Sequence, residues 1–323
     1  MLNKILKIAG CSCCVFLIVL IAAKPDIYLK SAGEGIKLWA LTVLPSLLPF
    51  FFLSSLSSAL GFTSFLSRIL QKPFSAVFRL PGVCAYAFVV SIVSGYPAGA
   101  KTVADLRENG FITDAEATRA GALCSSSGPL FVIGCVGAGA FGNSSAGYAL
   151  LLSHILSAIV CGLVFRFYGE YEHSRNRLIT PDKKLDNVLY ECAYSSVISI
   201  LVVGGFICVF YLIADAASSV GLTYPAERLS ELIFRDDNIA KGIAEGIVEC
   251  TRGCRRIAAS GVSRNAVSAA CGIISFGGIS VIAQSAAFLK KAKANVAIFF
   301  LSKILQSIVG FFICYLLFPS IVG

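Results

Sequence analysis

The sequence predicts an all-helical polytopic membrane protein with two homologous, inverted repeats, broken or re-entrant helices and an extra N-terminal helix. Of its 323 residues, 57% are hydrophobic and 14% are charged, whereas soluble domains have about 45–50% apolar and about 25% charged residues. Several apolar segments also approach or exceed the roughly 20 residues that a membrane-spanning helix needs. In addition, the two halves of the chain share short segments in the same order.

Charge and residue usage argue against several other classes of protein. The formal net charge of +9 fits lysines and arginines in cytoplasmic loops, together with a pathway for anions, better than a nucleic-acid surface. The 13 cysteines are scattered through apolar segments, where cysteine packs as a small hydrophobe. With only two histidines and no G-x-S-x-G motif, the sequence predicts no metal site, no cofactor and no enzyme. H+ or Na+ as a coupling ion stays open.

The apolar segments set the expected order of helices. Lys4 and Lys7 precede an apolar run, which predicts a retained, signal-like first helix at residues 5–23 within an N-terminal unit of residues 1–30. Pro45 and Pro49 are expected to kink the next segment because each removes a backbone donor. The later segments cover residues 36–60, 83–97, 122–141, 145–167, 195–218, 239–258, 266–289 and 294–319.

The chain divides nearly in half at a polar stretch, residues 168–190. "SHILSAIV" at 153–160 and "SKILQSIV" at 302–309 are identical at five of eight positions, with an offset of 302 − 153 = 149 residues. Nearly the same offset aligns Thr113 with Ser263, and both residues can cap a helix. We therefore predict one repeat over residues 31–167 and a second over residues 191–323. Duplicated halves with matching Gly/Pro breaks are typical of secondary transporters.

The stretch "SGYPAGAKT", residues 94–102, resembles a phosphate-binding loop only superficially, since its glycines are spaced differently from G-x-x-x-x-G-K. One interpretation is a helix break within the membrane whose freed N–H groups face an anion. The other is a G-x-x-x-G contact between helices. The apolar segment 83–97 falls short of a full span before this break, and "SSSGP" at 125–129 interrupts segment 122–141. Both segments are predicted to be half-spanning, and the serine tip is either a recognition site or a plain turn.

Charged residues also occur within the apolar second half. Charges at membrane depth are costly and usually mark a pathway or a paired site. Arg252, together with Lys101 of the first repeat, is predicted to supply positive charge to an anionic substrate. Glu249 then either positions Arg252 or carries a coupling proton. Arg255 and Arg256 fit a cytoplasmic helix end, and Asp215 is either a buried proton carrier or an interfacial residue.

The residues predicted to bind substrate lie at the breaks in the two repeats. They are Ser94, Gly95, Tyr96, Pro97, Gly99, Lys101, Ser125, Ser126, Ser127, Gly128, Glu249, Thr251, Arg252, Gly277 and Gly278. His154, which aligns with Lys303, is predicted to occupy a shared structural position and not a catalytic one. A lipid bilayer and a small anion are the expected partners, and a homo-oligomer is compatible with the sequence.

Four segments carry a resemblance to a known family. They are "LPSLLPFFFLSSL" (44–56), "SGYPAGAK" (94–101), "EATRAGALCSSSGPLFVIG" (116–134) and "GIVECTRG" (246–253). They resemble the YlbJ (SpoVV) family of sporulation membrane proteins, within the group with nucleoside-recognition (Gate) domains, which is similar to concentrative nucleoside transporters. The resemblance implies transport of dipicolinate during endospore formation, in the mother-cell (outer forespore) membrane. The alternatives are a nucleoside, another carboxylate, or a non-transporting scaffold for sporulation proteins.

Overall fold

The computed structural model describes residues 2–170 and 187–323, and helix is the only regular secondary structure in these two ranges. The predicted all-helical class is thus confirmed. Within the same ranges, four helical stretches are long and apolar enough to cross a membrane, one of them (Arg264–Lys291) interrupted at Gly277. Two further pairs of helices qualify if each bent pair forms one span. Most of the predicted polar connection at 168–190 lies outside the described residues.

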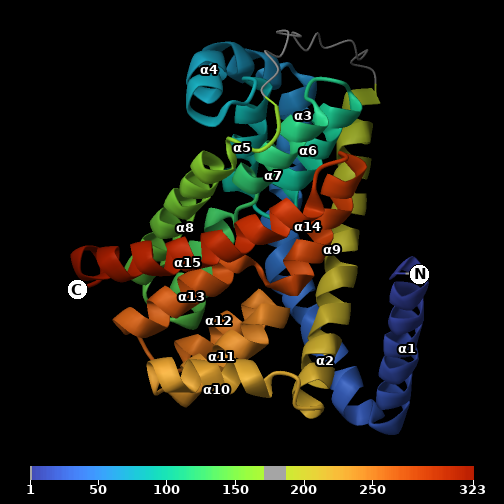
Figure 1. The fold of residues 1–323 in the computed structure, drawn as a ribbon, viewed down its shortest axis with the longest axis vertical. Coiled ribbons are helices and arrows are strands. Elements are labelled where there is room, and N and C mark those ends of the chain that lie inside the picture. The colour runs from blue at the N-terminus through green and yellow to red at the C-terminus, as the bar shows by residue number, and fades with distance from the viewer. Residues whose placement is uncertain (1, 171–186) are drawn as a thin grey trace.

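The helices follow the same order twice, after an N-terminal α1 (Leu2–Ala23) that stands beside the rest of the molecule (Figure 1). The first series is α2 (Pro25–Leu38), η1 (Trp39–Val43), α3 (Leu44–Ala59), α4 (Phe62–Phe78), α5 (Val83–Ser94), α6 (Ala98–Glu108), α7 (Asp114–Leu123), η2 (Leu130–Ala140) and α8 (Ser144–Phe165). The second series is α9 (Val188–Ser219), α10 (Tyr224–Phe234), α11 (Asp237–Val248), α12 (Cys250–Ala258), α13 (Arg264–Phe276), α14 (Gly278–Lys291) and α15 (Val296–Ile321). The bent rod α2–η1–α3 thus takes the place that α9 takes in the second series.

Backbone landmarks recur at equivalent places in the two series. Gly61 precedes α4 and Gly221 precedes α10, both with positive φ (89° and 74°). Arg79 and Arg235 follow the ends of the same two helices with φ of 53° and 52°, which is uncommon for a residue other than glycine.

The helix caps repeat as well. The Thr113 side chain caps α7 in a capping box with Glu116, and Ser263 caps α13 by accepting from the Ala266 N–H. The capping predicted at Thr113 and Ser263 is therefore confirmed.

The two series run in opposite directions where they meet. Three hydrogen bonds join α2 and η1 to α9, and their order shows that the two rods are antiparallel: Tyr28 with Ser219, Ser31 with Tyr211 and Trp39 with Ile200. Figure 1 shows the result, with α4 at one end of the long axis and α10 at the other. An inverted relationship between the two halves accounts for this arrangement.

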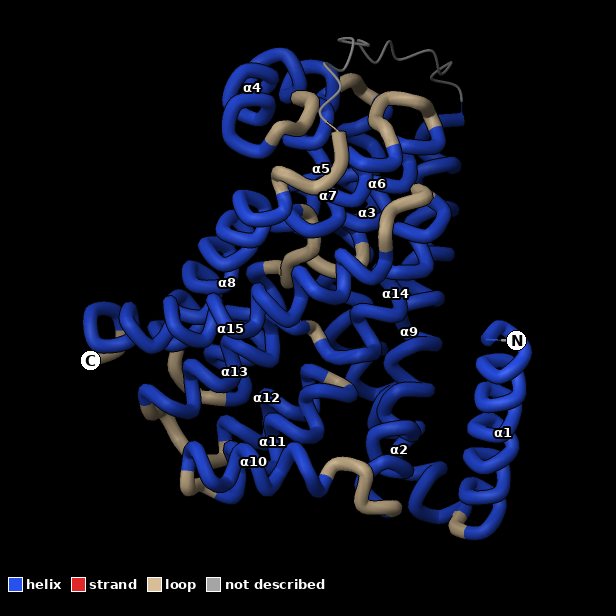
Figure 2. Tube along the Cα trace, viewed as in Figure 1, coloured by secondary structure: helices blue, strands red, loops and turns tan. Residues whose placement is uncertain are grey.

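The second half contains breaks where the apolar pattern suggested continuous segments. Segment 239–258 is two helices, because Glu249 has extended backbone (φ −138°, ψ 113°) and its side chain caps α12. Segment 266–289 is likewise broken, because Gly277 is left-handed (φ 87°) and ends α13. The kink expected from Pro45 and Pro49 is present as a 52° bend between Pro25–Val43 and Leu47–Ala59. Figure 2 shows that non-helical chain lies in the middle of the molecule as well as at its ends.

Candidate functional site

Two helix breaks of the first series pack directly against each other. The break between α5 and α6 spans residues 95–97, and the break between α7 and η2 spans residues 124–129. The Ser126 N–H donates to the Ser91 hydroxyl at 2.9 Å. A Cβ on Gly95, whose φ is 80°, would lie 2.6 Å from the Gly128 nitrogen, and one on Gly99 would overlap with the Cys124 carbonyl oxygen. The helix break within "SGYPAGAKT" is therefore present, and its glycines allow a close contact between the two breaks. That its freed N–H groups face an anion stays a prediction.

A buried polar junction lies beside this crossing, and Lys303 of α15 is its centre. The Lys303 ammonium is fully buried and donates to the Tyr96 hydroxyl at 2.7 Å, the Ser125 carbonyl at 3.0 Å and the Gln306 side-chain oxygen at 2.6 Å. It also lies 4.7 Å from the centroid of the Tyr96 ring. A Cβ added to Gly277 would lie 3.7 Å from the Tyr96 ring, so the broken helices of both series meet here.

His154 of α8 is the second buried polar residue of this junction. Its Nε2 accepts from the Ser127 N–H at 2.8 Å, and its Nδ1 lies 2.9 Å from the Ser275 hydroxyl. Because a backbone N–H can only donate, Nε2 carries no proton, and the geometry fits a neutral ring with the proton on Nδ1. The junction therefore contains the Lys303 amine beside a neutral imidazole.

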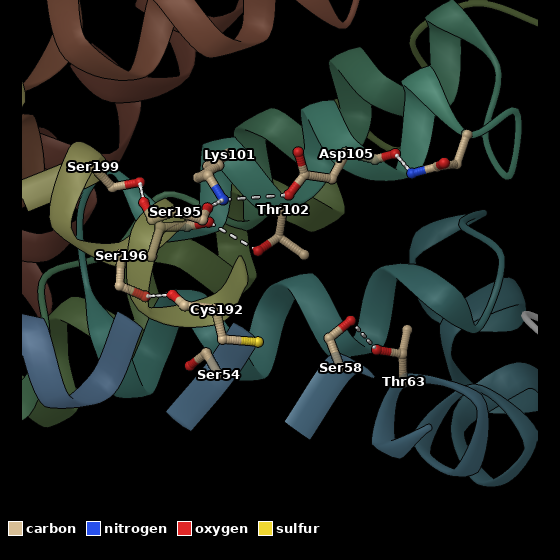
Figure 3. A network of polar contacts seen from close by, with 12 residues as sticks. Ser54, Ser58, Thr63, Lys101, Thr102, Asp105, Cys192, Ser195, Ser196 and Ser199 are labelled. Carbon is tan, nitrogen blue, oxygen red and sulfur yellow. Dashed lines mark hydrogen bonds and ion pairs between the residues drawn. The ribbon is translucent and has the colours of Figure 1, made fainter. Parts of the chain in front are cut away.

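A cavity of about 540 Å³ lies between α3, α6 and α9, and several predicted site residues lie on or beside its wall. Polar side chains line much of it (Figure 3). The hydroxyl groups are those of Ser54, Ser55, Ser58, Thr63, Tyr86, Thr102, Ser195, Ser196 and Ser199. The charged side chains are Lys101, Asp105 and Glu191. This size and lining suit a small polar solute.

Lys101 projects from the first turn of α6 toward α9. Its ammonium donates to the Ser195 hydroxyl at 3.1 Å and lies 3.7 Å from an Asp105 carboxylate oxygen, as Figure 3 shows. Pro97 and Ala98, at the start of α6, also line the cavity. The positive end of the α6 dipole therefore faces the same space as the Lys101 charge.

The second series has an equivalent crossing at Glu249. A Cβ on Gly278 would lie 3.0 Å from both the Cys250 nitrogen and the Gly246 carbonyl oxygen. Glu249 contacts Arg252 through the backbone and not through the guanidinium. Glu249 accepts from the backbone N–H of Arg252 at 2.8 Å, and it is nearly fully buried.

The Arg252 guanidinium pairs with two other carboxylates, Asp215 of α9 and Glu245 of α11. Asp215 is thus an ion-pair partner of Arg252, and its two interpretations, proton carrier or interfacial residue, stay predictions. Lys101 and Arg252 both contact α9, at positions 215 − 195 = 20 residues apart. Since a helix rises 1.5 Å per residue, the two contact points lie roughly 30 Å apart. One small anion cannot touch both cations in this conformation.

The predicted residues therefore lie in separate places, with Gly95 and Gly99 at the first crossing. Tyr96, Ser125–Gly128 and Gly277 meet at the buried junction, Pro97 and Lys101 line the cavity, and Glu249–Arg252 and Gly278 form the second crossing. Ser94 bonds Ser54 of the cavity wall at 3.0 Å.

Sequence analysis missed Lys303, Gln306 and Ser275, and it gave His154 only a structural role. The available signal was the alignment of His154 with Lys303, which placed polar residues at equivalent positions of two otherwise apolar helices.

Comparison with known proteins agrees with this architecture. A family model described as nucleoside recognition (Gate) matches residues 40–169. The chain is 31% identical to the sporulation integral membrane protein YlbJ of Bacillus subtilis (strain 168), over 95% of this chain and 81% of that protein. No solved structure matches the chain. The apolar helices and the Gate match define an integral membrane protein with a Gate-type region. More particularly, the chain belongs to the family of the sporulation membrane protein YlbJ.

Proposed function

We propose that this protein transports a small anionic metabolite across a membrane during spore formation, and that dipicolinate is the substrate. The observation that carries the proposal is the cavity at Lys101, which lies between rods of two oppositely directed series of helices. A planar aromatic dicarboxylate offers oxygens to an ammonium, to several hydroxyls and to the start of α6. These are the donors that line the cavity.

The two carboxylates of the cavity favour a proton as the coupling ion. Asp105 and Glu191 line the same space as Lys101, and their negative charges oppose the entry of an anion. A proton on Asp105 removes one negative charge and frees Lys101 for the substrate. We therefore propose that a proton enters together with the anion.

The two ends of α9 support an alternating-access mechanism. Near Ser195, Lys101 in the first turn of α6 faces an open cavity. Near Asp215 the corresponding cation of α12, Arg252, is held by Asp215 and Glu245. In transporters built from inverted repeats, one repeat moves against the other and so opens the two sides in turn. In the proposed cycle, the ion pairs of Arg252 break when the protein opens near Asp215. The cavity near Ser195 closes at the same time, and Lys101 becomes more tightly paired.

Uptake of labelled dipicolinate into liposomes that contain the purified protein tests the proposal. Lys101→Ala is the critical variant, and Lys241→Ala is its matched control because Lys241 is exposed and pairs with Asp237, away from the cavity. We expect saturable uptake of dipicolinate that is lost in Lys101→Ala and kept in Lys241→Ala, with little uptake of uridine. Preferred uptake of uridine would assign a nucleoside transporter. No uptake of either solute by folded protein would favour the scaffold alternative.

Cell location is a separate part of the proposal. Dipicolinate made in the mother cell has to cross the outer forespore membrane to reach the spore, so we propose that the protein resides there. Fluorescence microscopy of a fusion protein in sporulating cells tests this location. A signal confined to the vegetative cell membrane, or to the inner forespore membrane, contradicts it.

A further inference from the structure

Lys303 is a buried ammonium whose three hydrogen-bond partners are all neutral oxygens. A charged group taken out of water costs several kcal/mol unless other groups compensate for the lost hydration. Lys303 has no exposed surface, and its partners are a hydroxyl, a backbone carbonyl and an amide oxygen. Such a lysine requires a specific explanation, because nothing in the proposed transport site uses it.

The hydrogen bonds indicate that the Lys303 amine is protonated. The Ser125 carbonyl and the Gln306 side-chain oxygen can only accept. The Tyr96 hydroxyl can donate its own proton to the Ile274 carbonyl, 3.4 Å away, and in that arrangement it acts as an acceptor toward Lys303. Three acceptors around one nitrogen need three N–H donors, and only the ammonium form supplies them.

Two helix C-termini lie on this network: the loop after α7 contacts the ammonium directly, and the end of α13 reaches it through the Tyr96 hydroxyl. Ser125 follows the end of α7, and Ile274 lies in the last turn of α13. The C-terminal end of a helix carries a partial negative charge, which favours a cation there. In secondary transporters, carbonyl-rich ends of broken helices are the places where Na+ or H+ is coordinated. His154, the equivalent residue of α8, adds no competing positive charge because its ring is neutral.

We propose that Lys303 is a built-in cation that takes the place of a bound monovalent ion between the two broken helices. Its ammonium joins α15 of the second series to Tyr96 and Ser125 of the first series, and Gln306 of α15 itself supplies the third oxygen. The protein consequently needs no Na+ or K+ to hold this junction together. Removing the ammonium leaves an oxygen-lined space that accepts a small cation from solution. This inference concerns the folded protein itself, so it stands or falls separately from the proposed substrate.

Thermal unfolding of the detergent-purified protein in different chloride salts tests the inference. The salts are KCl, NaCl, methylammonium chloride and, as the bulky reference, N-methylglucamine chloride, at equal ionic strength. Wild type and the control Lys241→Ala are expected to unfold at the same temperature in all four. Lys303→Ala is expected to unfold at a lower temperature in the reference salt and to regain at least ~2 °C with a small cation.

Lys303→Met is the second variant, because it fills much of the space without the charge. It is expected to unfold at a lower temperature than wild type and to respond to none of the salts. Wild-type stability in Lys303→Met would show that the charge is dispensable and would overturn the inference. The inference would also be overturned if Lys303→Ala folds and has the same unfolding temperature in all four salts. If neither variant folds, the wild type is compared in the four salts. Equal unfolding temperatures support the inference, and a higher unfolding temperature in NaCl or KCl than in the reference salt overturns it, because a separate ion is then needed.

Discussion

His154 and Lys303 occupy equivalent positions in the two halves of the chain, and both bind the same serine-rich loop. The His154 ring accepts from the Ser127 N–H, and the Lys303 ammonium donates to the Ser125 carbonyl two residues earlier. One loop of the first half is therefore held by a matching helix from each half. The two equivalent helices therefore bind one loop from two sides of the repeat, and both polar residues are buried there.

Loss of the cavity cation should abolish transport and leave the fold intact. Lys101 is partly exposed and makes one hydroxyl contact and one long ion pair, so Lys101→Ala should change stability by less than about 1 kcal/mol. Its uptake of dipicolinate should fall at least ~10-fold, which corresponds to a lost interaction of about 1.4 kcal/mol. Uptake kinetics and the unfolding temperature, measured on one preparation, separate the two effects. Normal uptake would remove Lys101 from the site.

Proton coupling through Asp105 predicts a specific pH dependence. Uptake of dipicolinate by wild type should increase as the pH outside the liposome falls, because a protonated Asp105 no longer holds Lys101 or repels the anion. Asp105→Asn imitates the protonated form, and it should take up dipicolinate with a much weaker pH dependence. Glu191→Gln is the comparison, since Glu191 lines the cavity at a different wall. If Asp105→Asn keeps the wild-type pH profile, the proton acts elsewhere.

The ion pairs of Arg252 should stabilise the closed end of the molecule. Arg252→Ala leaves Asp215 and Glu245 without their shared partner, and all three side chains are mostly buried. We expect a lower unfolding temperature, corresponding to about 1–3 kcal/mol after allowance for partial solvent exposure. The double variant Arg252→Asp with Asp215→Arg restores one of the pairs and should recover part of the loss. A double variant no more stable than Arg252→Ala would argue against the pairing.

Gly99 should be intolerant of a side chain, because a Cβ there would overlap with the Cys124 carbonyl of the facing break. Gly99→Ala is expected to lower stability by about 1–3 kcal/mol, since the two backbones must move apart. Gly205→Ala in α9 is the matched control, because nothing in the described part of the chain lies within 4 Å of its added Cβ. That variant should be neutral or slightly stabilised, as alanine favours helix more than glycine does. Equal unfolding temperatures for both variants would contradict the close crossing.

Asp236 should make stability depend on pH at acidic values. Its carboxylate caps α11 by accepting from the Ile239 and Asn238 N–H groups, and it also accepts from the Ser260 hydroxyl. The Ile239 N–H, then the Ser260 hydroxyl, and more weakly the Asn238 N–H, lower the pKa of Asp236 below its ordinary value. A lowered folded-state pKa stabilises the protein above the unfolded-state pKa of about 3.9, and this contribution is lost as the pH falls through the folded-state pKa.

Asp236→Ala should therefore cost about 1 kcal/mol near neutral pH. Its difference from wild type should shrink as the pH falls below about 4. Unfolding temperatures measured from pH 7 down to pH 3 check this trend. The neighbouring Asp237→Ala is the control, because that carboxylate is exposed and pairs with the exposed Lys241.

Local patterns predicted much of the fold. Apolar segments placed most of the helices, Thr113 and Ser263 marked helix starts, and "SGYPAGAK" and "SSSGP" marked real breaks. The breaks at Glu249 and Gly277 were harder to see, because the apolar pattern continues across them. A buried carboxylate that caps the next helix and a left-handed glycine are local conformations that composition does not reveal.

The sequence by itself determined the class of protein, because the balance of apolar and charged residues sets whether a chain can face water or lipid. It also determined the repeat, since equivalent helices keep similar residues. Only the tertiary structure decided the partners of the charges. Lys101 and Arg252 looked like one anion site because their local contexts match, yet antiparallel packing sends them to opposite ends of α9. Lys303 looked like one more residue of an apolar helix, and its role depends on Tyr96 and Ser125, which lie far away in the chain. Contacts between distant segments follow from how helices pack, and no local pattern encodes them.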